Sequence, residues 1–190
     1  KAMNKELNDR RQMELDLREA LERNELELYY QPILNLRTNV ITGFEALARW
    51  RHPVKGMVPP ALFIPVAEDS ELILPLGEWA LREACRTAAQ WPDDLRIAVN
   101  LSPKQFTSPN LFHMIEQTLK ETGLAPQRLE LEITERIFME NNDSTLSMLR
   151  RIKELLRVPD GRAVREAIDR LAAACVAAGR AVRIDEVAGG

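Results

Sequence analysis

The sequence predicts an α/β domain built as part of a (β/α) barrel. Segments with the alternation and the aromatic content of strands are separated by helical segments of roughly ten to fifteen residues. Oxygen-bearing side chains recur at the C-terminal ends of these strands, where parallel barrels build their active sites. With 190 residues, 45% of them hydrophobic, the chain is long enough to bury the core of one such domain.

The N-terminal segment is predicted to be an amphipathic helix. Its apolar residues recur every four positions within residues 8–25: Met13, Leu17 and Leu21. This spacing places them on one stripe, which is expected to face a core. We predict that residues 1–11 are a linker and that the domain begins at residue 12.

Strands and helices alternate through the rest of the domain. Strands are predicted at residues 26–36, 40–50, 96–102 and 128–134. The first two flank turn residues and are expected to pair as a hairpin, whereas the others follow helices as in βαβ units and are expected to be parallel. Helices are predicted at residues 60–69, 74–91, 109–122 and 142–156, and residues 51–60 are predicted to be a loop.

Composition and charge narrow the classes of function. The net charge of -3 gives no basic surface for a nucleic acid polymer. Cys85 and Cys175 lie in helical patterns rather than in metal or redox spacings, so we expect reduced thiols and a cytoplasmic location. The sequence contains no signal peptide and no long apolar run, so we expect no membrane contact by this chain.

Charged side chains inside an apolar strand indicate a site. The stretch "GFEALARW" carries Glu45 and Arg49, which are costly in a strand unless each has a partner or a ligand. Glu45, Asn100, Glu132 and Glu135 all lie at or just beyond strand C-terminal ends. Hard oxygen donors from several strands suit Mg²⁺ or Mn²⁺, and an arginine beside them suits a phosphate. The alternative is that each acidic residue is a solvated strand end.

Four segments resemble the EAL-type cyclic di-GMP phosphodiesterases. They are "YYQPILNLRTNVITGFEALARWRHP", "FIPVAEDS", "AVNLSPKQF" and "LELEITE", which occur in the order and spacing of that family. The resemblance runs from about residue 12 to residue 155. It implies a modified TIM barrel with an antiparallel first strand, a pair of Mg²⁺ or Mn²⁺ ions, and hydrolysis of cyclic di-GMP to pGpG.

The resemblance also implies roles for individual residues. Glu45, Asn100 and Glu132 match the metal ligands of the family. Glu135 matches the glutamate that steadies the following active-site loop and is the residue we assign to catalysis. The matches to substrate contacts are Gln31, Leu47 and Arg49. The leading helix resembles the linker that follows diguanylate cyclase domains, so such a domain is an expected upstream partner.

The tail at residues 156–190 departs from the family. The family continues with a DDFGTG motif and further strand–helix units, whereas this tail is rich in Ala and Arg and is expected to form a helix and a short strand. The aspartate pair, the catalytic lysine and the later glutamates have no match. Two-metal hydrolysis needs both ions and a base for the attacking water, so we expect impaired hydrolysis.

Three readings therefore stay open from the sequence. The first is a cyclic di-GMP phosphodiesterase domain with weak activity in this chain. The second is a non-catalytic module that binds cyclic di-GMP or a protein partner. The third is a truncated or rearranged coding sequence whose tail has no role. A partial barrel leaves sheet edges and apolar surface uncovered, so we also expect a homodimer with a contribution from the tail.

Overall fold

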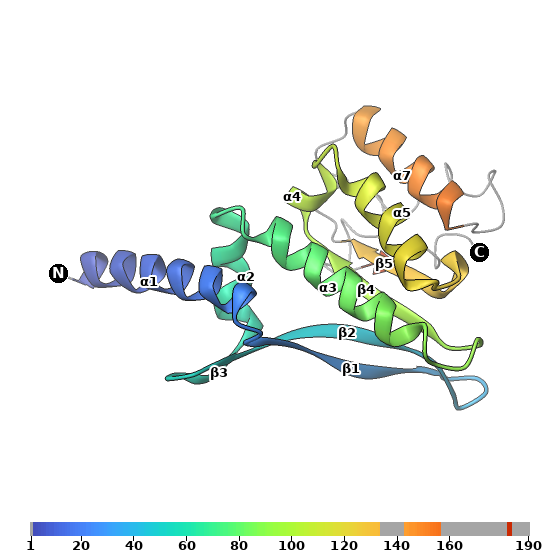
Figure 1. The fold of residues 1–190 in the computed structure, drawn as a ribbon, viewed down its shortest axis with the longest axis horizontal. Coiled ribbons are helices and arrows are strands. Elements are labelled where there is room, and N and C mark those ends of the chain that lie inside the picture. Colours follow the sequence, from blue (N-terminus) through green and yellow to red (C-terminus); the bar gives the residue numbers. More distant parts are fainter. Residues whose placement is uncertain (1, 134–142, 157–181, 184–190) are drawn as a thin grey trace.

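The structure is a computed structural model that describes residues 2–133, 143–156 and 182–183 (Figure 1). Its helices are α1 (Ala2–Glu22), α2 (Pro60–Asp69), α3 (Ile73–Ala88), α4 (Pro103–Phe106), α5 (Leu111–Thr122), the 3₁₀ helix η1 (Pro126–Arg128) and α7 (Asp143–Leu155). Its strands are β1 (Leu26–Asn35), β2 (Val40–His52), β3 (Gly56–Val58), β4 (Arg96–Leu101), β5 (Leu129–Ile133) and β6 (Val182–Arg183). None of the helices in these ranges has both the length and the apolar character needed to cross a membrane.

The strands form one sheet in the order β1-β2-β4-β5-β6, with β3 added beside β2. β1 and β2 are antiparallel, whereas β2–β4 and β4–β5 are parallel. This arrangement confirms the predicted hairpin and the predicted parallel strands that follow it. Beyond residue 156, the structure describes only β6, which pairs antiparallel with β5. The predicted tail helix lies outside the described residues.

Helices α3, α5 and α7 cover one face of the sheet (Figure 1). The core between them contains alternate residues of the parallel strands, namely Ala46, Ile97, Val99, Leu101, Leu129, Leu131 and Ile133. These pack against buried helix residues that include Leu81, Cys85, Ile115 and Ile152. Since only alternate strand residues enter this core, the intervening residues face the opposite side of the sheet.

A second core anchors α1 and α2 near the C-terminal end of β2. Leu17, Trp50 and Phe63 are fully buried there. Met13 and Leu21 pack against the same core, which confirms the predicted stripe of α1. The helix begins at Ala2, so the residues predicted as a linker are helical. The boundary between linker and domain stays a prediction.

Two predictions of local structure were partly wrong. Residues 51–60, predicted as a loop, contain the end of β2 and all of β3, which pair antiparallel across a turn at Gly56. The positive φ of Gly56 permits the turn, and the burial of Trp50 and Val58 stabilises the pairing. The helix predicted at 74–91 ends at Ala88, and Arg128 Nη2 donates to the Ala88 carbonyl at 2.7 Å, which satisfies a helix-end acceptor.

Candidate functional site

The residues assigned to the site lie on the sheet face opposite the helices. On β2, Glu45, Leu47 and Arg49 alternate with the core-facing residues, and Gln31 of β1 is the cross-strand partner of Glu45. Paired residues point to the same face of a sheet, so Gln31 and Glu45 share this face. The structure thus brings together the substrate residues predicted from the sequence.

Glu45 and Asn100 are in direct contact. Asn100 Nδ2 donates to Glu45 Oε1 at 2.8 Å, across the parallel pair β2–β4. Glu45 is half-buried and Asn100 is exposed. The bond uses the amide nitrogen of Asn100, which leaves its carbonyl oxygen as a donor for a cation.

Glu132 is the third member of the predicted ligand set. It is the parallel-strand partner of Asn100, and it is only 8% exposed. Two carboxylates and one amide from three adjacent strands match the hard oxygen donors that Mg²⁺ and Mn²⁺ prefer. No group of three His, Cys, Asp or Glu side chains able to hold a metal occurs in the part of the chain that the structure describes. The donors therefore fit such an ion in chemistry, but they provide only part of a closed coordination shell.

Arg49 is held beside this set by an aromatic ring and a carbonyl. Its guanidinium carbon lies 5.4 Å from the centroid of the Tyr29 ring, and its Nη1 donates to the Ala48 carbonyl at 2.9 Å. Stacking on a ring leaves the edge of a guanidinium available for a bidentate contact with an anion. The sequence did not identify Tyr29 as a site residue, because its contact with Arg49 depends on the strand register.

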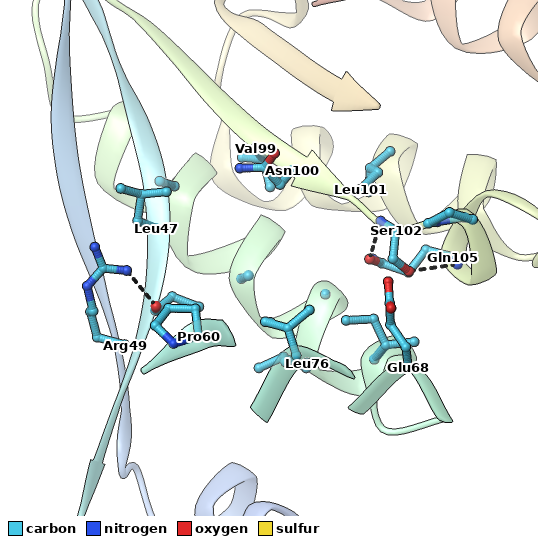
Figure 2. A pocket seen from close by; sticks show the side chains of 17 residues that line it. Leu47, Arg49, Pro60, Glu68, Leu76, Val99, Asn100, Leu101, Ser102 and Gln105 are labelled. Atoms are coloured by element: carbon cyan, nitrogen blue, oxygen red, sulfur yellow. Dashed lines mark hydrogen bonds between the residues drawn. The ribbon is translucent and has the colours of Figure 1, made fainter. Parts of the chain in front are cut away.

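A pocket of about 380 Å³ opens at the C-terminal ends of β2 and β4 (Figure 2). Leu47 and Arg49 line it from β2, and Asn100 lines it from β4. Core-facing strand residues such as Ala46 and Val99 also line it, together with apolar residues of α2 and α3 that include Ile64, Ile73 and Leu76. The pocket therefore extends to the side of the sheet that the helices cover. This is the size and character of a small-molecule site, with polar groups placed at its ends.

The far wall of the pocket carries a second polar group of residues. Figure 2 shows Glu68 of α2 pointing toward Ser102 and Gln105, which belong to the turn after β4. The sequence analysis did not single out these residues as site residues. The pattern Ser-x-x-Gln at 102–105 is a helix-start signal that identifies two of them. Glu135, the residue assigned to catalysis, lies outside the described residues.

The fold and the site together define a domain of the β/α-barrel type, with a polar site at the C-terminal ends of its parallel strands. The sequence profile of the EAL domain matches residues 14–156. The chain therefore belongs to the EAL domain family, and the described part of it is a partial, TIM-like α/β barrel.

The relatives support the same assignment. The chain is 52% identical over 153 residues to the uncharacterized protein y4lL of Sinorhizobium fredii, covering 80% of this chain and 18% of that protein. It is 40% identical over 158 residues to the bifunctional diguanylate cyclase/cyclic di-GMP phosphodiesterase MucR of Pseudomonas aeruginosa, covering 81% of this chain and 23% of that protein.

A solved structure of similar fold carries the cyclic dinucleotide itself. It is the PaMucR phosphodiesterase in complex with c-di-GMP, with a TM-score of 0.73 and 41% identity over 76% of this chain and 60% of that one. The chain thus spans about a fifth of the length of the curated relatives named above.

Proposed function

We propose that this chain carries the first part of a cyclic di-GMP phosphodiesterase site. The observation that supports it best is the contact between Glu45 and Asn100, with Arg49 four residues further along the same face of β2. The similarity to MucR, which is named as a cyclic di-GMP phosphodiesterase, supports the substrate. Oxygen donors for a cation that lie beside an arginine for a phosphate suit a phosphodiester substrate.

Each residue of the site has a distinct task in this proposal. Glu45, Asn100 and Glu132 would hold Mg²⁺ or Mn²⁺, which when bound supplies a Lewis acid for the phosphodiester and acidifies water. Arg49 would exchange its bond with the Ala48 carbonyl for a phosphate oxygen, while the Tyr29 ring keeps its plane fixed. Leu47, which lines the pocket, and Gln31, the neighbour of Glu45, would contact the rest of the substrate.

Hydrolysis by the 190-residue chain alone is proposed to be weak. The family match ends at residue 156, and the base and the further ligands implied by the resemblance belong to later motifs. Loss of positioned acid–base catalysis alone lowers rates by roughly 10²–10⁴-fold. Turnover of about 1 per second or faster would contradict this proposal, because that is the ordinary range for enzymes.

The test is calorimetric titration of the chain with cyclic di-GMP in Mn²⁺, followed by an assay for pGpG. Binding is expected, and both Glu45→Gln and Arg49→Met are expected to weaken it by about tenfold or more, in line with a lost charged contact. Glu116→Gln and Arg86→Met are matched controls on the outer helices α5 and α3, and both should leave binding unchanged. Equal affinity in all five proteins would contradict the proposed site.

The second candidate is a non-catalytic module that binds the dinucleotide or a protein partner. It is favoured by the end of the family match at residue 156, before the motifs that the resemblance assigns to catalysis. Tight binding of cyclic di-GMP with no pGpG formed would support this candidate over the first. A chain that neither binds nor hydrolyses the dinucleotide would exclude the first candidate and leave the interaction role.

We also propose the setting in which the domain works. The long helix α1 is suited to connect it with an upstream diguanylate cyclase domain, an arrangement supported by the bifunctional name of MucR. Cys85 is a free, buried thiol, which fits a reducing, cytoplasmic environment. A homodimer with a contribution from residues 157–190 is tested by light scattering on the chain and on a version that ends at Leu155. A compact monomer in both forms would contradict the dimer.

A further inference from the structure

The turn that follows Asn100 is closed by two reciprocal hydrogen bonds. Gln105 Oε1 accepts from the Ser102 backbone N–H at 3.1 Å, and Ser102 Oγ accepts from the Gln105 N–H at 3.3 Å. The two residues form a capping box at the start of α4, with Pro103 in the first turn. The backbone of β4 therefore passes directly from Asn100 and Leu101 into a fixed turn.

Gln105 also locks this turn onto the neighbouring helix. Its side chain is 3% exposed, and it fills the space that Gly77 of α3 leaves by lacking a Cβ. Helix α4 has only four residues, too few to be stable from its own hydrogen bonds. The buried contacts of Gln105, together with Phe106, are what hold the turn in one place.

Among the described residues, the side chain of Asn100 has less support. It is exposed, and the hydrogen bond that the structure describes for it is the one to Glu45. One exposed hydrogen bond contributes little orientation on its own. The direction of the Asn100 amide is therefore set by the backbone at the end of β4, and that backbone is fixed by the turn.

We propose that Gln105 is a positioning residue of the candidate metal site. Through the capping box it holds the end of β4, and so keeps the Asn100 amide beside Glu45 with its carbonyl oxygen turned toward the ligand. This inference rests on the proposed function in one respect, namely that the group held by Asn100 and Glu45 is a divalent cation. A rival role exists, because Gln105 lines the pocket and its Nε2 has no hydrogen-bond partner among the described residues. That nitrogen could instead contact a ligand directly.

The test compares Gln105→Met, which removes the acceptor at similar volume, with Gln105→Glu, which keeps it. Thr118→Val is the matched control, since Thr118 is also buried with no described partner for its hydroxyl but lies on α5, away from the site. Two properties are measured on each protein. The first is the NMR signal of the Asn100 side-chain amide together with hydrogen exchange of the Ser102 N–H. The second is Mn²⁺ affinity by titration.

In Gln105→Met we expect faster exchange at Ser102, a shifted Asn100 signal and a loss of roughly 10- to 100-fold in Mn²⁺ affinity, as for other residues that orient metal ligands. Gln105→Glu should restore most of each property, and Thr118→Val should change none. If Gln105→Met does not fold, Ser102→Ala, which removes the other half of the box, is judged by the same criteria.

Three outcomes would overturn the positioning role. One is a folded Gln105→Met with an unchanged Asn100 signal. Another is a protein that is merely less stable, with wild-type Mn²⁺ affinity. The third is weaker cyclic di-GMP binding with unchanged Asn100 signal and Mn²⁺ affinity, which would assign Gln105 to the ligand. If the wild-type chain binds no Mn²⁺, the proposed metal site fails, but the NMR comparison still decides whether Gln105 positions Asn100.

Discussion

Asp16 is expected to fix helix α1 to the end of β2, the strand that carries Glu45 and Arg49. Its carboxylate accepts from Lys55 Nζ at 2.6 Å and from His52 Nε2 at 3.1 Å. Because His52 Nδ1 accepts backbone N–H groups, its proton lies on Nε2 and points at Asp16. The Asp16 side chain is 19% exposed, so the contact is partly shielded from water.

The pKa of Asp16 provides a magnitude for this contact. Burial alone would raise the pKa, but hydrogen bonds from Lys55, Gln12 and His52 outweigh it and lower the pKa from 3.8 to about 2. A depressed pKa in the folded state stabilises the protein above the unfolded value, and this stability is lost as the pH falls from about 4 toward about 2. A shift of nearly two pH units corresponds to ~2.5 kcal/mol. Since Lys55 is 43% exposed, screening reduces the expected value to about 1 kcal/mol.

Asp16→Asn keeps the shape of the side chain and removes its charge. At pH 7 the free energy of unfolding, measured by urea titration, should fall by about 1 kcal/mol. Near pH 3 the difference from wild type should shrink to about half, because Asp16 of the unfolded wild-type chain is then mostly protonated while that of the folded chain is still mostly ionised. Asp9→Asn, at an exposed position of the same helix, should change stability by less than about 0.5 kcal/mol at either pH. The reasoning is refuted if Asp16→Asn costs the same at pH 7 and pH 3, or no more than Asp9→Asn.

Three further predictions concern the two cores. Burial raises the pKa of the Cys85 thiol to about 12, so a thiol reagent should label it only in urea, as read by mass spectrometry; labelling in the native state would contradict this. Leu17→Ala should lower the free energy of unfolding by about 2–4 kcal/mol, because Leu17 is fully buried in the core that contains Trp50; a loss below about 1 kcal/mol would mean that α1 is not docked there. Gly77→Ala would bring a Cβ into the Gln105 amide and should cost about 1–3 kcal/mol in a denaturant titration, and a neutral effect would show that the contact is loose.

Much of the fold follows from periodicity in the sequence, and the failures have physical causes. The stripe of α1 was predicted because its apolar residues repeat with the period of a helix, and the four main strands because of their composition and their place between helical segments. β3 has only three residues, so its pairing with β2 depends on the burial of Val58 opposite Trp50, which no local pattern reveals. The carbonyl at the end of α3 is satisfied by Arg128, 40 residues further along the chain, a contact that no local pattern reveals.

The residues of the site could be predicted from the sequence, but the contacts between them could not. Asn100 and Glu132 stand at strand ends in the sequence, and the register makes them neighbours. The bond between Asn100 and Glu45, and the ring of Tyr29 under Arg49, depend on which residues face each other across strands. Register is a tertiary property, since the same alternating strand can pair in more than one way.

Register also explains why charges are tolerated inside "GFEALARW". Ala46, Val99 and Leu131 form one row across β2, β4 and β5, and each is at most 7% exposed beneath the helices. The residues on either side of that row, such as Glu45 on β2 and Asn100 on β4, must then face away from the helices. A slip of one residue would bury Glu45 against α3 and expose Ala46. The sheet would then lose apolar burial and contain a buried charge without a partner. The apolar packing on one face therefore selects the register that assembles the oxygen donors on the other.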